Sequence, residues 1–178
     1  MESRPRLHVL ILLTAGLCPA AWARTLLTQE QALRIAFGEA KPERRSASLT
    51  EDRRKEAERL AQARVENVEW TWYVATSSSG AKSYAYFDTH VVRTMPETAL
   101  VVLNDKGALR FVELVAFHEP DDYKPTKRWL RQLDGRALDR DLYVRRGIRN
   151  ITGASLTSEA LTQAVRRVLA VHRLLQTP

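Results

Sequence analysis

The sequence predicts an α+β domain in which helices pack on an antiparallel sheet of about four strands. The middle of the chain alternates apolar and polar residues with many β-branched and aromatic side chains, whereas the segments on either side have helical periodicity. With 178 residues, of which 44% are hydrophobic, the chain is long enough for one domain and short for two. We therefore expect one core between sheet and helices.

Residues 1–23 have the pattern of a secretory signal peptide. Two arginines precede an apolar run over residues 7–17, and Ala21-Trp22-Ala23 has the small-any-small pattern of a signal peptidase site. The run is shorter than the roughly 18 apolar residues that span a bilayer, so the mature chain is expected to have no transmembrane helix. A lipoprotein signal at Cys18 is disfavoured because Leu17 stands where a lipobox has Gly or Ala. We expect export to the periplasm or to the outer face of the cytoplasmic membrane.

Cysteine content and charge exclude several classes of function. Cys18 is the only cysteine, so cleavage after Ala23 leaves neither disulfides nor thiol chemistry, and no Cys-any-any-Cys-His motif exists for covalent haem. The net charge of +7 comes from basic residues spread along the chain without the aromatic interleaving of a single-strand binder. In an exported protein, this charge indicates an acidic electron-transfer partner or simple solubility rather than nucleic acid.

Residues 24–68 are predicted to form an N-terminal helical segment. Thr28-Gln29-Glu30-Gln31 resembles a capping box, and the helix that it begins should end before Gly38. The polar residues 41–49, which include Pro42, are expected to form a loop. A second helix should begin at Thr50 and continue to about Val65.

From Glu69 the apolar period changes to that of strands. Four strands are expected, covering residues 70–76, 84–87 with an extension to 91–92, 98–103 and 109–117. The last two form the clearest hairpin, because Asn104-Asp105-Lys106-Gly107 lies between them. A short helix should then run through residues 124–133 and end at Asp134-Gly135.

Residues 150–158 are small and rich in hydroxyl groups, and they lead into an amphipathic helix expected from about Glu159. A helix start leaves unpaired N–H groups and a partial positive charge, so it stabilises an anion. Gly153 and Ala154 would let a ligand approach the backbone, and Ser155, Thr157 and Ser158 would add hydroxyl donors. The alternative is an ordinary loop whose Ser and Thr residues cap a helix.

The stretch Thr152-Gly153-Ala154-Ser155-Leu156-Thr157 resembles the flavinylation signature of the FMN-binding domain family, Ser/Thr-Gly-Ala-Thr/Ser-any-Thr. This family includes the extracytoplasmic flavin subunits of Rnf and sodium-pumping NADH:quinone oxidoreductase complexes. By position, the resemblance implies that Thr157 carries FMN through a phosphoester and that a separate FAD-dependent flavin transferase attaches it. The rest of the signature and Ser158 would then contact the cofactor. Ahead of the signature, where the family often has an acidic residue, this chain has Arg149 and Asn150.

A second set of residues stands in the order found in this family after its strand-turn-strand unit. These residues are His118, Glu119, Tyr123 and Trp129. The resemblance implies an FMN-binding domain over residues 69–178 in which they lie beside the flavin. The residues alone leave open a structural role for the histidine and a core position for the two aromatic residues. His90 and His118 could protonate a reduced flavin, but they lack the close spacing of a metal site, and no metal is expected.

These observations together predict an exported electron-transfer flavoprotein, a protein or subunit that exchanges electrons with redox partner proteins, which can be membrane-bound. No Ser-His-Asp order or Gly-any-Ser-any-Gly elbow indicates hydrolysis. Positive charge at Arg145, Arg146 and Arg149 would favour the reduced flavin and raise its potential. The alternative is a non-catalytic envelope protein of the same fold that binds a partner or a non-covalent phosphate ligand.

Overall fold

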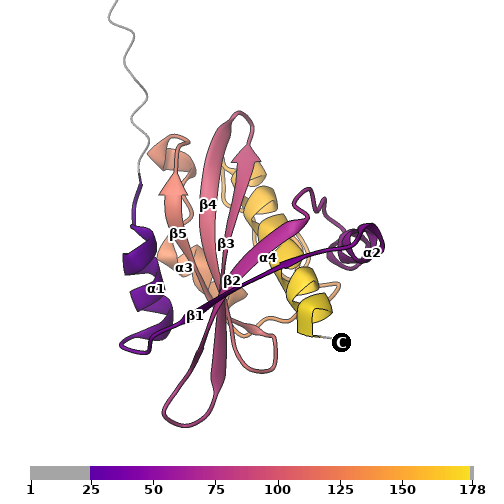
Figure 1. Cartoon of the computed structure of the whole chain (residues 1–178). Coiled ribbons are helices and arrows are strands. Elements are labelled where there is room, and N and C mark those ends of the chain that lie inside the picture. The colour runs from indigo at the N-terminus through magenta and orange to yellow at the C-terminus, as the bar shows by residue number, and fades with distance from the viewer. Residues whose placement is uncertain (1–24, 177–178) are drawn as a thin grey trace, which may run out of the picture.

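The computed structural model describes residues 25–176, so the expected signal peptide over residues 1–23 lies outside the described part. The described residues form one antiparallel sheet with helices on both faces (Figure 1). In chain order the elements are α1 (Gln29–Phe37), β1 (Glu43–Ser48), α2 (Glu51–Ala61), β2 (Glu69–Thr76), β3 (Lys82–Val92), β4 (Met95–Leu103), β5 (Leu109–Phe117), η1 (Asp121–Tyr123), α3 (Lys127–Leu130), η2 (Arg131–Leu133) and α4 (Ser155–Gln176). The expected α+β class is confirmed, with five strands instead of about four.

The five strands follow one another in the order β1-β2-β3-β4-β5, and each pairs antiparallel with the next. The β4–β5 hairpin has the predicted turn, in which Asn104 Oδ1 accepts hydrogen bonds from the amides of Lys106 and Ala108, both at 3.0 Å. The β3–β4 hairpin is tighter, since Val92 pairs with Met95 and only two residues lie between them. The β3–β4 turn and the end of β5 therefore lie at the same end of the sheet.

The prediction of a loop at residues 41–49 is wrong, because this segment contains β1. It pairs with β2 from Glu43 opposite Val74 to Ser48 opposite Glu69, and most of its side chains are exposed. Only Ala47 of this edge strand packs against the core, so the period-two pattern that identifies a half-buried strand is missing. Backbone pairing with β2 is what makes it a strand.

The bounds of α1 and the start of α2 agree with the predictions, whereas the end of α2 and the start of α4 each differ by four residues. The capping box at Thr28 and Gln31 is present, and α1 stops at Gly38 with a φ of 63°. Helix α2 begins after Thr50 but ends at Ala61, short of the expected Val65. Arg166 of α4 donates to the carbonyl oxygen of Ala61 at 2.6 Å, so a residue far away in the sequence caps this end.

Helix α4 covers one face of the sheet, with α2 packed on its far side, and α1 lies against the other face (Figure 1). The larger core, between sheet and α4, includes Leu49 and Val65 from the expected segment 24–68, so one core joins this segment to the rest. Helix α4 begins near the β3–β4 turn and ends near the β4–β5 turn, where its His172 lies beside Gly107. Within residues 25–176, no helix is both long and apolar enough to cross a membrane.

Candidate functional site

The predicted signature forms the turn before α4 and its first helical residues. The helix begins at Ser155, four residues earlier than the expected Glu159. Gly153 has a φ of 81°, and the amide of Ala154 donates to the carbonyl oxygen of Ile151 at 3.0 Å. Local hydrogen bonds hold this turn: the Ser158 hydroxyl accepts from the Ile151 amide at 2.9 Å and donates to the Ala154 carbonyl at 3.1 Å.

The start of α4 differs from those of the other three α-helices. Thr28, Thr50 and Thr126 each cap a helix by accepting a hydrogen bond from a backbone amide of its first turn, at 3.2–3.3 Å. In the described chain, no such bond reaches the amides of Ser155, Leu156 or Thr157. Three donors at the positive end of a 22-residue helix are therefore available to an anion.

The signature residues divide between two sides of this helix start. Thr152, Gly153 and Leu156 are exposed and Ser155 is half-buried, whereas Ala154, Thr157 and Ser158 are buried. Thr157 is only 2% exposed and is among the buried residues of α4. A group bonded to its side chain would therefore begin on the buried side of the helix, while the exposed residues would lie outside it.

The hydroxyl of Thr157 nevertheless differs from its neighbours on the buried face. Ser158 closes the turn, and the Thr162 hydroxyl donates to the Ser158 carbonyl at 2.7 Å. Within residues 25–176, Thr157 Oγ1 makes no hydrogen bond, yet it is absent from the group of fully buried polar atoms without a partner. The small exposure of Thr157 therefore includes its hydroxyl oxygen, which has no hydrogen-bond partner among the described residues.

The predicted residues around residue 120 lie at the end of the sheet that contains the β3–β4 turn. His118 makes a hydrogen bond through Nδ1 to the carbonyl oxygen of Pro96 at 2.7 Å, so it joins the loop after β5 to the start of β4. The Arg93 guanidinium of the β3–β4 turn lies over the Tyr123 ring, 4.9 Å from its centroid. Oε1 of Glu119 is buried and has no partner among the described residues.

Trp129 lies in the core, which was the alternative to a contact with the flavin. It is 9% exposed and belongs to the core between sheet and α4. Its Nε1 donates to the carbonyl oxygen of Arg149 at 2.7 Å, and Gln132 accepts from the amide of Arg149 at 2.8 Å. Trp129 therefore fixes the backbone just ahead of the signature.

A row of charged side chains on β3 and β4 faces α4 near this helix start. Arg167 donates two hydrogen bonds to Asp88, at 2.9 and 2.7 Å, and Nδ1 of His90 lies 3.0 Å from Oδ1 of the same carboxylate. Opposite His90 on β4 is Glu97, whose Oε1 is 4.0 Å from His90 Nε2. Glu97 is fully buried, and neither its oxygens nor His90 Nε2 have a partner among the described residues.

Burial and neighbouring charges change the acidity of both carboxyl groups. Burial raises the pKa of Glu97 to about 8, and the negative charges of Asp88 and Glu119 contribute to the rise. For Asp88, burial opposes ionisation, but the hydrogen bonds from His90 and Arg167 outweigh it and lower the pKa. The row therefore holds one ionised carboxylate and one carboxyl group that keeps its proton at neutral pH.

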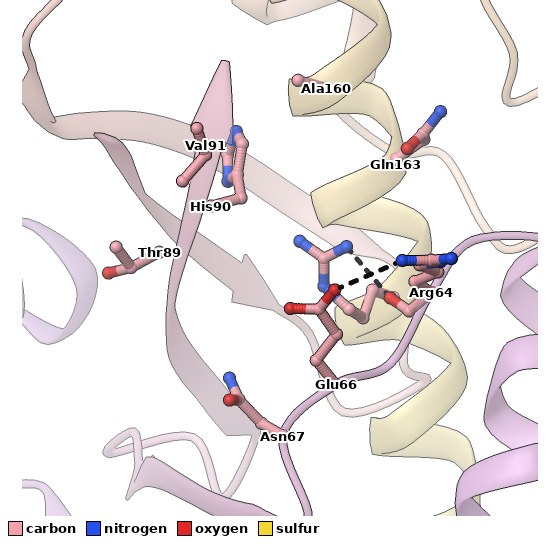
Figure 2. Close-up of a pocket in the computed structure, with 9 residues that line it drawn as sticks. Arg64, Glu66, Asn67, Thr89, His90, Val91, Ala160 and Gln163 are labelled. Atoms are coloured by element: carbon pink, nitrogen blue, oxygen red, sulfur yellow. Dashed lines mark hydrogen bonds and ion pairs between the residues drawn. The ribbon is translucent and has the colours of Figure 1, made fainter. Parts of the chain in front are cut away.

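A pocket of about 300 Å³ lies beside this row, between α4, the end of β3 and the segment after α2. Figure 2 shows His90 and Val91 of β3 on one side and Ala160 and Gln163 of α4 on the other. Its lining also contains Arg64, Glu66, Asn67, Thr89 and Arg167. Its lining residue Ala160 follows Thr157 by about one helical turn, so the pocket lies along the first turns of α4, although the signature residues do not line it.

The sequence indicated part of this site and missed the rest. His90 was a candidate, but Asp88, Glu97 and Arg167 were not. One local signal existed, since Asp88 and His90 are two residues apart in a strand and so share a face. Among the described residues, no group of three or more His, Cys, Asp or Glu side chains is arranged to hold a metal ion.

Comparisons of the chain with protein-family models, curated proteins and solved structures give no match. The signature and the geometry at the start of α4 are therefore the observations that bear on function.

Proposed function

We propose that this protein is an exported electron-transfer flavoprotein that carries FMN on Thr157 through a phosphoester. The observation that carries the proposal is the free hydroxyl of Thr157 beside three unbonded amides at the start of α4. A phosphate needs this combination, because the hydroxyl oxygen forms the ester and the amides donate to the remaining phosphate oxygens. Bound FMN would supply transfer of one or two electrons.

The surrounding residues suit the rest of such a cofactor. Leu156 and Val91 are exposed apolar side chains near the signature and the pocket, and they offer contact surface to a flat ring. Arg64 and Arg167 line the pocket, where Arg64 pairs with Glu66 at 3.9 Å and Arg167 with Asp88, so each could also donate to an anionic group of the cofactor. The chain's own part is to bind and orient the cofactor and to set its potential.

Attachment of FMN at this position requires local movement. Thr157 is 2% exposed, which leaves no room for a transferase to reach it in the packed helix. The first turn of α4 must therefore separate from the sheet, or be unpacked, when the FAD-dependent transferase acts. The turn before it is suited to such opening, because Thr152 and Gly153 are exposed and the helix start has no side-chain cap.

The test is the intact mass of the exported chain after coexpression with a flavin transferase. Wild type should carry one FMN that stays bound after denaturation, and Thr157→Val should carry none. Thr162→Val is the matched control, because Thr162 lies on the same buried face of α4 but uses its hydroxyl within the helix. A bare mass for wild type, or covalent flavin on Thr157→Val, would contradict the proposal.

The burial of Thr157 favours one second candidate, a protein that binds a phosphate-containing ligand without a covalent bond. The same three amides would hold the phosphate, and the threonine would stay packed against the sheet. In this case a yellow protein would lose its colour on denaturation. Thr157→Val would then bind the ligand about as well as wild type does.

A further inference from the structure

The buried Glu97 and the partly buried His90 face each other across the β3–β4 hairpin. His90 and Glu97 are cross-strand partners, and His90 Nε2 is 4.0 Å from Glu97 Oε1. These two atoms and Glu97 Oε2 have no partner among the residues described. Buried polar atoms are normally paired, and exceptions concentrate at functional sites.

Asp88 determines which nitrogen of His90 is free to exchange a proton. The contact between His90 Nδ1 and Asp88 Oδ1, at 3.0 Å, places a proton on Nδ1, because the carboxylate can only accept. Two hydrogen bonds from Arg167 hold this carboxylate in place. Nε2 is therefore left as the basic atom of the ring, facing Glu97.

The charges around this pair make its proton occupancy sensitive to any new charge nearby. Asp88 and Glu119 are negative, Arg167 is positive, and burial raises the pKa of Glu97 to about 8. The protonation of Glu97 therefore depends on the charges around it. An added negative charge in the pocket, whose lining includes His90 and Arg167, would increase the affinity of this carboxyl group for a proton.

We propose that His90 and Glu97 take up a proton from solvent when an electron enters the pocket beside them, so that this pair couples proton uptake to electron transfer. The inference rests on the proposed function, because the electron resides on the FMN held at Thr157. A reduced one-electron carrier protein supplies the electron and is oxidised. The proton forms one new bond, to His90 Nε2 or to a Glu97 oxygen, and no other bond of the chain changes.

The experiment measures the midpoint potential of the flavinylated chain from pH 6 to pH 10 and the proton uptake on reduction in weakly buffered solution. Wild type should show a change of slope near pH 8 and take up more protons per electron below this pH than Glu97→Gln does. The Glu97→Gln variant should lose the change of slope. Glu113→Gln is the matched control, since Glu113 is a half-buried carboxylate of β5 that lines a separate pocket with Ile35 of α1.

A second measurement uses the unmodified mature chain and needs no flavin. In infrared spectra, the carbonyl band of a protonated carboxylic acid should be present at pH 7, disappear as the pH rises through about 8, and be missing from Glu97→Gln. Absence of this band from wild type at pH 7 would overturn the inference. A His90→Gln variant provides a second test of the pair, and it should shift the pH at which the band disappears.

The outcomes separate this inference from the proposed function. If wild type carries no flavin, both are overturned, whatever the infrared band shows. If wild type carries flavin but Glu97→Gln has the same pH dependence and proton uptake as wild type, only the coupling is overturned. Loss of the change of slope in Glu113→Gln as well as in Glu97→Gln would also overturn it, because the effect would then not belong to this pair.

Discussion

The two ends of the interface between α4 and the sheet each contain a histidine, but only one end satisfies its buried polar groups. At the end of α4, Nδ1 of His172 lies 2.8 Å from the Tyr86 hydroxyl, and the Tyr84 ring packs against the imidazole with centroids 4.6 Å apart. At the start of α4, His90 Nε2 and both oxygens of Glu97 are buried without partners in the described chain. The first arrangement stabilises the fold, whereas the second costs stability.

The difference between the two ends indicates which part of the fold can hold a binding or reaction site. Both histidines lie between the same helix and the same sheet, so burial by itself does not explain the difference. The satisfied end pairs one neutral donor with one neutral acceptor. The unsatisfied end gathers Asp88, Glu97 and Glu119 near one arginine, and natural proteins tolerate such conflicts mainly at binding and reaction sites.

The largest effect should follow from breaking the satisfied end. The Tyr86→Phe variant removes the partner of His172 Nδ1 and leaves this nitrogen buried and unpaired. We expect a loss of about 2 kcal/mol in the free energy of unfolding, measured with urea at pH 7. Wild-type stability in this variant would show that the Tyr86–His172 contact adds nothing to the fold.

Removing the buried, unpaired carboxyl group at the other end should have a smaller effect, and this effect should stabilise the fold. The Glu97→Gln variant should raise the free energy of unfolding by about 1 kcal/mol at pH 9 and leave it nearly unchanged at pH 4.5. The gain is modest because the glutamine amide would also lack partners. Urea unfolding at the two pH values measures it, and equal effects at both would contradict the raised pKa of Glu97.

The pH dependence of stability should separate the two ends further. The folded-state pKa of Glu97, raised to about 8 from 4.5, means that its stabilising contribution is complete below pH 4.5 and is lost as the pH rises through 8. Burial lowers the pKa of His172 to about 4 from 6.5, so its contribution is complete above pH 6.5 and is lost as the pH falls through 4. We expect Glu97→Gln to flatten the alkaline side of the profile and His172→Gln the acid side, in a series of thermal melts.

The smallest effect should come from removing a positive charge that lies outside the interface between α4 and the sheet. Arg149 is exposed just ahead of the signature, and its backbone is fixed by Trp129 and Gln132. The Arg149→Gln variant keeps this backbone and should lower the midpoint potential of bound flavin slightly, because one positive charge near the reduced state is lost. The shift should shrink further at high salt. An unchanged potential at low salt would remove Arg149 from the set of residues that tune the flavin.

Much of the fold could be predicted because its signals are local. The threonine caps at Thr28 and Thr50 identify helix starts through bonds that span three residues, and the turn at Asn104 identifies the β4–β5 hairpin in the same way. Strand β1 could not be found, because the strand with which it pairs, β2, lies more than twenty residues later in the chain. The early start of α4 depends on Ser158, whose hydroxyl closes the turn once the segment is packed.

The amino-acid sequence by itself determined the fold class, the position of the signature before the last helix and the threonine proposed to carry FMN. Hydrophobic periodicity, turn residues and a six-residue signature each act over a short stretch, so they are visible without a structure. Only the tertiary structure decided that Thr157 is buried and that Glu97 faces His90. Strand register and helix packing bring together residues as far apart as Asp88 and Arg167, and they determine which side of α4 is shielded from water.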